Sequence, residues 1–429
     1  MSWDLVVVGA GPAGAAAALG ALAVEPGMSV LLLDRQEFPR DKACGDGIAP
    51  QVFDLLAEVG VTGVVDDRTP IRRLSLRRGA LGVDRLMERA AYVVPRMVFD
   101  ERLVLAAVAA GAVLRKQRVG RVEVRPSGVM VDDVEARMVV GADGAYSLVR
   151  GALGIASGPV ALALRGYAPT PVGRAGQQVI VFGTARQPSY AWSFDRGDGW
   201  SNVGYGEQLR DRSTGAGLLR VGRELSARAG LVRAERGRLT RAGLVRAERG
   251  RLTRAGLVRA ERGRLTRAGL VAELERLLPG AGDGGVDWRG HHLPLASWGW
   301  RPSGGRVMLV GDAAGLINPM TGEGIYYAVA TGLMAGRAAA GALRRGSGDA
   351  GTEYRRAVKG LLGRHLRDTA LAARLTRSGR VLDAGIRASA ADQRVFDNLV
   401  EIGLADGVLR SGALLRIARQ LGTGVGGGW

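Results

Sequence analysis

The chain has 429 residues, of which 47% are hydrophobic and 24% charged, and this length allows two or three domains around a large core. The formal net charge of +19 comes almost entirely from arginine, since only Lys42, Lys116 and Lys359 are lysines. Such an arginine bias weakens any inference from basic charge to nucleic acid. The single cysteine, Cys44, excludes an internal disulfide and fits a reducing cytoplasm, and no Cys/His cluster has the spacing of a zinc site.

The N-terminal segment predicts the first unit of a parallel sheet. Leu5–Val8 is a short apolar run typical of a strand, Gly9–Gly14 is a glycine turn, and Ala15–Val24 is a helix of small residues. Val30–Leu33 follows as a second buried strand. This order of strand, turn, helix and strand indicates a doubly wound α/β fold.

The uncharged stretch at 5–24 is also long enough to span a bilayer. It consists mostly of Ala and Gly, and glycines and Pro12 interrupt it, so we expect it to be buried in a soluble domain. Asp4 stands where a signal peptide carries positive charge, and no Ala-x-Ala cleavage site follows.

The glycine turn carries a dinucleotide-binding motif, Gly9-x-Gly11-x-x-Gly14. The first glycine permits the tight turn, the second lets the backbone approach a pyrophosphate, and the third lets the helix pack on the strand. The N-terminus of the helix then stabilises the anion. Asp34 ends the next strand, where a carboxylate can accept hydrogen bonds from a ribose hydroxyl.

Two further glycine–aspartate motifs indicate that the dinucleotide is a flavin. One contains Asp143 after the strand Val139–Val140, and the other contains Asp312 after the strand Val307–Val310. An aspartate at such a strand end can bind ribityl hydroxyls. The segment Gly322–Gly324 then opens a helix whose dipole can face the N1/C2-carbonyl edge of a flavin.

The segment 156–210 alternates as strands do, with strands predicted at Gln178–Phe182, Ala191–Phe194 and Asn202–Tyr205. We assign it to a second domain that covers one face of the cofactor. From about residue 335 the chain is rich in Ala, Leu and Arg with helical periodicity, and it ends in a Gly-Gly-Gly-Trp tail.

A 13-residue segment, RAGLVRAERGRLT, occurs three times in tandem at 228–266, and a fourth copy departs after Val271. Each unit has four Arg and one Glu, so the three copies carry +9 of the net charge. Thirteen residues advance a helix by about 3.6 turns, so the apolar residues rotate between faces. We interpret the repeat as a tolerated surface expansion of helices and loops, with a basic patch for acidic lipid or a partner as the alternative.

Four segments carry motifs of a known family. They are PRDKACGDG at 39–47, RMVFD at 96–100 followed by Leu103, YAWSF with GDG and NVGYG at 190–206, and NPMTGEGIYY at 318–327. With these motifs the chain resembles the FAD-dependent para-hydroxybenzoate-hydroxylase-like superfamily and, within it, the geranylgeranyl reductase family. The resemblance covers nearly the whole chain except 228–266. It departs at Asp195, where the family usually has proline.

The resemblance implies an FAD-dependent oxidoreductase that saturates carbon–carbon double bonds of an isoprenoid (geranylgeranyl or prenyl) substrate by flavin hydride transfer. An unactivated alkene cannot hold negative charge on a carbonyl, so this chemistry needs a dry, apolar site. The motifs assign FAD binding to Gly9, Gly11, Pro12, Ala13, Gly14, Asp34, Arg35, Lys42, Cys44, Gly45, Arg96, Asp143, Gly311, Asp312, Gly322, Gly324 and Ile325.

The same resemblance assigns the substrate pocket to Tyr190, Trp192, Phe194 and Asn202, and catalytic roles to Cys44, Tyr190 and Trp192. The three aromatic residues alternate along one strand and therefore share a face, although they could equally form domain core. Cys44 is a candidate proton donor or a group that tunes the flavin. We predict no metal site, because His291, His292 and His365 have neither ligand nor triad spacing.

Two other function classes remain open. A flavin monooxygenase, a hydroxylase or epoxidase of an apolar or aromatic metabolite, would use the same fold. A halogenase fits less well, because such enzymes carry W-x-W-x-I-P where this chain has Tyr190–Asp195, and no lysine lies between Lys42 and Lys116. A nucleic-acid-binding module would use the Arg-rich repeat, but the repeat lacks aromatic residues for stacking on bases.

We therefore expect an α/β fold, α+β overall, with a Rossmann-type FAD-binding domain, an inserted β-sheet substrate domain and a C-terminal helical region. The boundaries are 1–68, 96–155 and 285–340 for the FAD-binding domain, 69–95 and 156–284 for the cap with its tandem repeat, and 341–429 for the helices. Expected partners are FAD, NADPH or reduced ferredoxin as electron donor, and a hydrophobic prenyl substrate, without nucleic acid. The expected location is cytoplasmic, with peripheral contact at the inner face of the membrane as an open question, like the oligomeric state.

Overall fold

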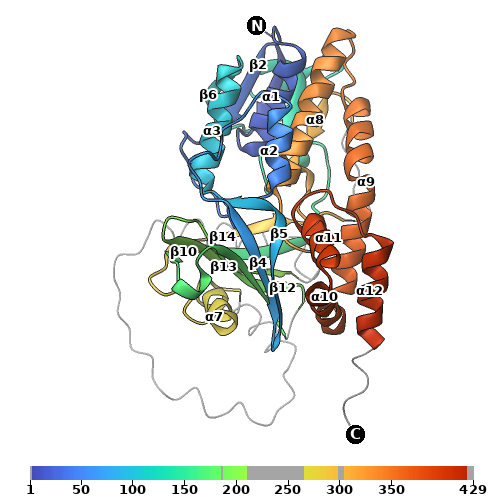
Figure 1. Ribbon diagram of the computed structural model, residues 1–429. Coiled ribbons are helices and arrows are strands. Elements are labelled where there is room, and N and C mark those ends of the chain that lie inside the picture. Colours follow the sequence, from blue (N-terminus) through green and yellow to red (C-terminus); the bar gives the residue numbers. More distant parts are fainter. Residues whose placement is uncertain (1, 185–186, 210–264, 298–303, 423–429) are drawn as a thin grey trace, which may run out of the picture.

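The computed structural model describes residues 2–184, 187–209, 265–297 and 304–422, which form two β-sheets and a helical region (Figure 1). The repeat copies up to residue 264 and the Gly-Gly-Gly-Trp tail lie outside these ranges. Within them, no helix combines the length and apolar character needed to cross a bilayer. The uncharged stretch at 5–24 is instead divided between a strand and a buried helix.

The first sheet, here called the Rossmann sheet, is built from segments far apart in the sequence. Its strand order is β6 (Val113–Lys116), β2 (Val30–Asp34), β1 (Trp3–Val8), β9 (Val134–Gly141), β8 (Val129–Val131) and β7 (Val122–Val124), and β15 (Val307–Leu309) also pairs with β9. The pairs β6–β2, β2–β1, β1–β9 and β9–β15 are parallel. This confirms the doubly wound parallel fold with long insertions between its strands.

The second sheet, here called the cap sheet, has eight strands in the described part of the chain. Their order is β14 (Val286–Pro294), β10 (Val160–Pro169), β13 (Trp200–Gln208), β12 (Ser189–Asp195), β11 (Gln177–Phe182), β4 (Ile71–Arg78), β5 (Leu81–Val93) and β3 (Gly47–Ile48). The three strands predicted in the inserted segment therefore appear as β11, β12 and β13, each one or more residues longer than expected.

Strand β14 corrects one domain boundary. The sequence boundary at 285 assigned it to the FAD-binding domain, but Val286–Pro294 pairs with β10 at the edge of the cap sheet. Most residues of β14 are exposed or half-buried. An edge strand of this kind lacks the apolar alternation that would have marked it as part of the sheet.

The helices are α1 (Pro12–Val24), α2 (Pro50–Ala57), α3 (Arg96–Ala109), α4 (Leu148–Ala152), α7 (Arg267–Leu277), α8 (Ile325–Arg344), α9 (Gly351–Leu375), α10 (Gly379–Ala391), α11 (Gln393–Leu404) and α12 (Ser411–Gly422), with 3-10 turns η1 (Val172–Arg174) and η4 (Gly311–Ala314). The described start of the fourth repeat copy forms the first turns of α7, capped by Thr266.

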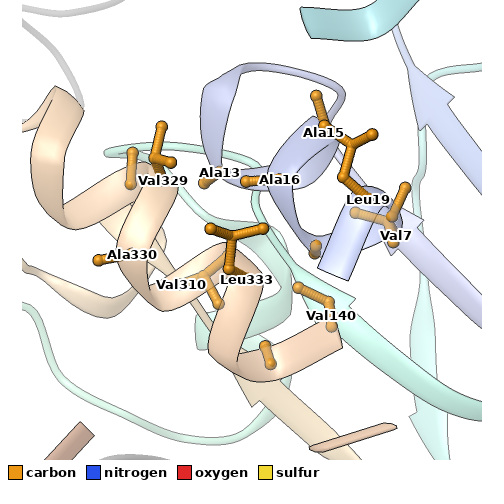
Figure 2. Packing of buried hydrophobic residues seen from close by; sticks show 14 of the residues in the cluster. Val7, Ala13, Ala15, Ala16, Leu19, Val140, Val310, Val329, Ala330 and Leu333 are labelled. Carbon is orange, nitrogen blue, oxygen red and sulfur yellow. The ribbon is translucent and has the colours of Figure 1, made fainter. Parts of the chain in front are cut away.

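The small residues of α1 serve close packing against α8. A Cβ on Gly20 would lie 2.5 Å from the carbonyl oxygen of Leu333, and a Cβ on Gly336 would lie 2.0 Å from that of Ala17. Figure 2 shows Ala13 and Ala16 of α1 beside Val329 and Leu333 of α8. The Ala- and Gly-rich composition of this stretch therefore reflects helix-to-helix contact through backbone atoms.

The C-terminal helices and α7 cover opposite faces of the cap sheet. Ile386 of α10 and Phe396 of α11 pack in one cluster with Leu74 of β4. On the other face Leu270 and Leu274 of α7 pack with residues of β10, β11 and β13. Because side chains alternate along a strand, the aromatic side chains of β12 lie on the face of the sheet that the C-terminal helices cover.

Candidate active site

A large cavity of about 3190 Å³ joins the Rossmann sheet to the cap. It begins at the turn between β1 and α1, passes the loop at 40–48, and ends among side chains of α9 to α12. It is lined by the predicted residues Gly9, Gly11, Pro12, Ala13, Asp34, Arg35, Lys42, Cys44, Gly45, Arg96, Asp143, Tyr190, Trp192, Phe194, Asp312, Gly322, Gly324 and Ile325. Gly14, Asn202 and Gly311 do not line it.

The glycine turn has the geometry that a dinucleotide requires. Gly9 adopts φ +98°, and a Cβ there would lie 2.4 Å from the carbonyl oxygen of Ala142. A Cβ on Gly14 would lie 1.8 Å from the carbonyl oxygen of Gly9, so Gly14 is required for packing and not for contact with a ligand. Gly11 is the N-cap of α1 and has no side chain that could cap the first N–H groups of that helix. These donors lie at the cavity and fit the pyrophosphate of FAD.

Charged groups surround this turn. The carboxylate of Asp34 accepts a hydrogen bond from the backbone N–H of Ala10 at 2.9 Å. The guanidinium of Arg40 lies 3.5 Å from Asp34 and 3.2 Å from Asp100. Arg96 forms a buried pair with Asp100 through two hydrogen bonds of 2.6 and 2.9 Å. The turn is thus bordered by two arginines, which fits a ligand with two negative phosphates.

The two strand-end aspartates differ in what they bind. Asp143 accepts hydrogen bonds from the Ser147 hydroxyl at 2.5 Å and from the backbone N–H of Leu148 at 2.6 Å. Both of its oxygens are therefore engaged at the start of α4. Asp312 is paired with Lys42 at 2.8 Å, and both side chains line the cavity. Asp312 is the better placed of the two for a ribityl chain, and Asp143 acts as a helix cap.

The N-terminus of α8 faces the same cavity and carries a carboxylate that the motifs did not single out. Glu323 accepts a hydrogen bond from the backbone N–H of Tyr326 at 2.9 Å. Burial raises the pKa of Glu323 to about 7, although the N–H groups of Tyr326, Ile325 and Gly324 oppose the shift. The helix end predicted to face a flavin therefore already holds a group that titrates near neutrality.

Tyr190, Trp192 and Phe194 form an aromatic wall on one side of the cavity, as their alternation predicted. The ring centroids of Tyr190 and Trp192 are 5.8 Å apart, and those of Trp192 and Phe194 are 6.4 Å apart. The hydroxyl of Tyr190 donates to the carbonyl of Thr321, which ties the wall to the loop before α8. A Cβ on Gly204 would lie 2.3 Å from the Trp192 ring, so the glycine is needed to seat this indole.

Asn202 was predicted to line the substrate pocket, but it is not among the residues that line the cavity. It is fully buried, on the same face of the sheet as its cross-strand partner Phe194. Its oxygen accepts from Trp192 Nε1 at 2.8 Å, and its Nδ2 donates to the carbonyl of Cys44 and to Asp46, each at 2.8 Å. The alternation of β13 alone could not reveal that these hydrogen bonds occupy the side chain.

Cys44 lies where the loop at 40–48 meets the aromatic wall. A Cβ on the neighbouring Gly45 would lie 3.5 Å from the Phe194 ring. Burial raises the pKa of the Cys44 thiol, the positive charge of Arg96 opposes this, and the negative charge of Asp46 adds to it. The site therefore favours the protonated thiol over the thiolate.

Asp195, which stands in place of the family's proline, has a structural role at the end of β12. Its carboxylate accepts from the backbone N–H groups of Gly176 at 2.6 Å and Gly197 at 3.0 Å, and from the Thr170 hydroxyl at 3.2 Å. These contacts fix the turn after the aromatic wall in a different way from a proline ring.

The far end of the cavity is apolar and was not predicted from sequence. Side chains from β4 and β11 face side chains from the C-terminal helices across it. They are Leu74, Leu76, Ile180 and Phe182 on the sheet, and Leu382, Ile386, Val400, Leu404, Leu414 and Ile417 on the helices. The helical periodicity after residue 335 indicated buried faces, but not which element they would meet.

The histidines have mixed surroundings. His365 is buried and bonded to Tyr327 at 2.5 Å, and His292 contacts Tyr146. His291 lines the cavity, where burial and then Lys42 lower its pKa to about 3 and keep it neutral. In the described ranges no group of three or more His, Cys, Asp or Glu side chains could hold a metal ion.

Comparisons with known proteins agree with this geometry. Residues 2–164 match the FAD binding domain model. The chain is 31% identical over 361 residues to a menaquinone reductase of Mycolicibacterium smegmatis, covering 77% of this chain and 75% of that protein. It is 28% identical to digeranylgeranylglycerophospholipid reductase 1 of Methanopyrus kandleri, covering 80% and 82%. A crystal structure of a geranylgeranyl bacteriochlorophyll reductase-like protein of Thermoplasma acidophilum has the same fold, with a TM-score of 0.67, 19% identity, and coverage of 98% and 96%.

Proposed function

Because the chain belongs to the geranylgeranyl reductase family of FAD-dependent oxidoreductases, we propose that it saturates isolated carbon–carbon double bonds in the isoprenoid chain of a lipid-soluble substrate. The observation that carries this proposal is the continuity of one cavity. It runs from a phosphate-binding turn, past a thiol and an aromatic wall, into an apolar chamber. The substrates named for the relatives, a menaquinone and a digeranylgeranyl phospholipid, both carry prenyl chains and support it.

The residues at the Rossmann end would hold FAD. The N–H groups at the start of α1 would bind the pyrophosphate, Asp34 would bind the ribose, and Asp312, which is paired with Lys42, would bind the ribityl chain. The N-terminus of α8 stabilises negative charge at the flavin edge. When bound and reduced, FAD supplies the hydride that an alkene needs.

The protein's own groups make the site dry and supply the proton. The aromatic wall, with Trp192 only 4% exposed, excludes water from the reacting carbons. Cys44 holds a proton at Sγ, because burial raises the pKa of this thiol. Tyr190 is held against the loop before α8 and keeps the wall closed at that side.

The apolar chamber would hold the rest of the prenyl chain. Its lining includes Leu382 and Ile386 of α10 facing Leu74 and Ile180 of the cap sheet. An isoprenoid offers only CH, CH2 and CH3 groups, so burial of its apolar surface there supplies binding energy of about 25 cal/mol per Å2. The chamber therefore selects a substrate by the length and shape of its apolar chain and not by polar contacts.

The same proposal places the chamber mouth against a membrane. Leu375 of α9 and Leu414 of α12 line the cavity and are also 44% and 42% exposed. Leu371, Leu415 and Leu421 are exposed nearby on the same two helices. Exposed arginines close in sequence to these leucines are Arg374 on α9, Arg377 in the turn after it, Arg380 at the start of α10 and Arg419 on α12. Leucines flanked by arginines fit the surface of an anionic bilayer, which implies a cytoplasmic protein in peripheral contact with the inner face.

Sedimentation with vesicles tests this contact. The wild-type protein is expected to co-sediment with phosphatidylglycerol vesicles and much less with phosphatidylcholine vesicles. Leu415→Glu should abolish the binding, whereas Leu105→Glu on α3, where Leu105 is 60% exposed, should leave it intact. Equal binding by both variants would refute the membrane contact without touching the reductase proposal.

Anaerobic turnover tests the reductase itself. With dithionite as reductant, the holoenzyme should add two hydrogens per double bond to a geranylgeranyl lipid or menaquinone, seen as a 2-Da gain in mass. A product that forms only with oxygen and gains 16 Da would instead identify a monooxygenase. Anaerobic bleaching of the flavin absorbance by NADPH or by reduced ferredoxin, each supplied alone, identifies the electron donor.

A further inference from the structure

Asp46 is a buried carboxylate that neither the motifs nor the proposed function has used. It is fully buried, lines the cavity, and adopts φ +59°, which is unusual for a residue with a side chain. In the described part of the chain its Oδ1 has no hydrogen-bond partner. A strained and half-satisfied carboxylate in a cavity wall is costly, and such groups concentrate at functional sites.

The other oxygen of Asp46 is held by two strands of the cap sheet. Its Oδ2 accepts from the Tyr167 hydroxyl at 2.6 Å and from Asn202 Nδ2 at 2.8 Å. Asn202 is itself oriented by Trp192 of the aromatic wall. The guanidinium of Arg165 stacks over the Tyr167 ring at 4.3 Å and pairs with Asp41 at 2.6 Å. The carboxyl is thus fixed in position relative to the wall.

Asp46 is also coupled to Cys44, two residues earlier. Its backbone N–H bonds to the thiol, and its negative charge raises the pKa of that thiol. The charged and titratable groups that face Asp46 are Arg165 and Tyr167 on β10, Arg96 on α3, and Cys44 on its own loop. Burial raises the pKa of Asp46 to about 6, although Arg165 and the hydrogen bonds of Tyr167 and Asn202 oppose the shift.

We propose that Asp46 is the proton reservoir that restores the thiol of Cys44 after each reduction. This inference rests on the proposed function. In the reduction, hydride from the reduced flavin forms one C–H bond, and the Sγ–H proton of Cys44 forms the other as the carbon–carbon double bond is lost. The thiolate that remains takes the proton of the Asp46 carboxyl through an intervening water, since Asp46 Oδ1 has no hydrogen-bond partner in the described residues, and Asp46 regains a proton from solvent when product leaves.

A burst experiment separates this role from a structural one. With excess dithionite, Asp46→Asn should complete its first turnover at a rate within a factor of about two of wild type, because Cys44 starts protonated. Its later turnovers should be slower by about 100-fold, the usual contribution of a general acid. A variant that loses the first turnover together with the later ones contradicts the proposal, as does one with no loss at all.

Alkylation of Cys44 tests the coupling without turnover, because the chain has one cysteine. In the apoprotein, the pH midpoint of iodoacetamide labelling, read by mass spectrometry, should move down in Asp46→Asn. An unmoved midpoint overturns the inference even if FAD binding is lost. If the midpoint moves but the wild type reduces no prenyl lipid, the coupling holds and the proposed function fails.

Tyr167→Phe provides the matched variant that keeps the carboxyl. Loss of the hydroxyl removes a hydrogen bond that lowers the pKa of Asp46. The pH above which the steady-state rate falls should therefore rise by about one unit. Glu323→Gln should leave the position of this fall unchanged. If the pH of this fall changes in Glu323→Gln and not in Tyr167→Phe, the reservoir is Glu323 and the role of Asp46 is refuted.

Discussion

The Rossmann half and the cap half of the molecule are packed in different ways. In the Rossmann half, α1 and α8 meet through backbone atoms, and added Cβ atoms would approach carbonyl oxygens to 2.0–2.5 Å. In the cap half, aliphatic side chains of the sheet and of α9 to α12 face one another across the chamber. The first arrangement is rigid and suits a site that always binds the same cofactor. The second fits an apolar chain whose length and position can vary.

The two halves also treat polar groups differently. At the glycine turn the backbone N–H groups of α1 are left open to the cavity. Beside the aromatic wall, by contrast, the side chains of Asn202 and Tyr167 both bond to Asp46. The Rossmann half therefore presents backbone donors to the cavity together with charged side chains, whereas the cap half presents a network of side chains that bond to one another.

The largest effect is expected from a substitution that disrupts the backbone packing of the Rossmann half. In Gly14→Ala the new Cβ would lie 1.8 Å from the carbonyl oxygen of Gly9, so the free energy of unfolding should fall by at least about 4 kcal/mol and FAD should be lost. Gly360→Ala on α9 meets no atom within 4 Å and should stabilise the protein by roughly 0.5–1 kcal/mol. Urea unfolding and FAD content measure both, and equal behaviour of the two variants would contradict the comparison.

The next effect concerns the buried carboxylate of the cap half. Because burial raises the pKa of Asp46 from 3.8 to about 6, the contribution of Asp46 to stability is fully present below about pH 4 and is lost as pH rises through about 6. Asp46→Asn should therefore raise the free energy of unfolding at pH 8 by up to about 3 kcal/mol and leave it unchanged at low pH. The control is Asp54→Asn, which should lose a little stability at pH 8, since Arg89 lowers the pKa of that exposed carboxyl. A gain for Asp46→Asn that does not depend on pH would show that its ionisation is not responsible.

The smallest effect is expected from a substitution that fills part of the chamber. Ile386 is 4% exposed and lines the cavity, so Ile386→Trp should shorten the space available to a chain. The KM for a geranylgeranyl substrate should rise by about tenfold, while that for a geranyl analogue and the affinity for FAD should be nearly unchanged. An equal rise in KM for the geranylgeranyl and the geranyl substrates would mean that the chain does not reach α10.

Sequence reasoning predicted the Rossmann half well because its signals are local. The strand β1, the glycine turn and Asp34 lie within a short stretch of chain, and the structure places them together as expected. The bounds differ by a few residues: the helix begins at Pro12 instead of Ala15, since proline is well suited to the first turn, and β1 begins at Trp3 instead of Leu5.

The cap half was less predictable because its signals are tertiary. The edge strand β14 has little apolar pattern, and Asn202 bonds to protein groups. Asp46 was visible within a motif, but only the fold reveals the burial that raises its pKa to about 6. The same limit applies in the Rossmann half to Asp143, which bonds to the start of α4, and to Glu323, whose pKa burial raises to about 7. The meeting of α10 with β4 and β11 depends on contacts between residues hundreds of positions apart, which periodicity does not encode.

The most direct test of the account joins both halves in one measurement. Purified protein, reconstituted with FAD and reduced with dithionite under anaerobic conditions, is mixed with a geranylgeranyl lipid in D2O, and the product is analysed by mass spectrometry. The account predicts a saturated bond that carries a solvent-derived deuterium at each of its two carbons, because dithionite supplies electrons only and both the hydride and the proton then originate from the solvent. A lipid recovered unchanged from FAD-loaded protein would contradict it.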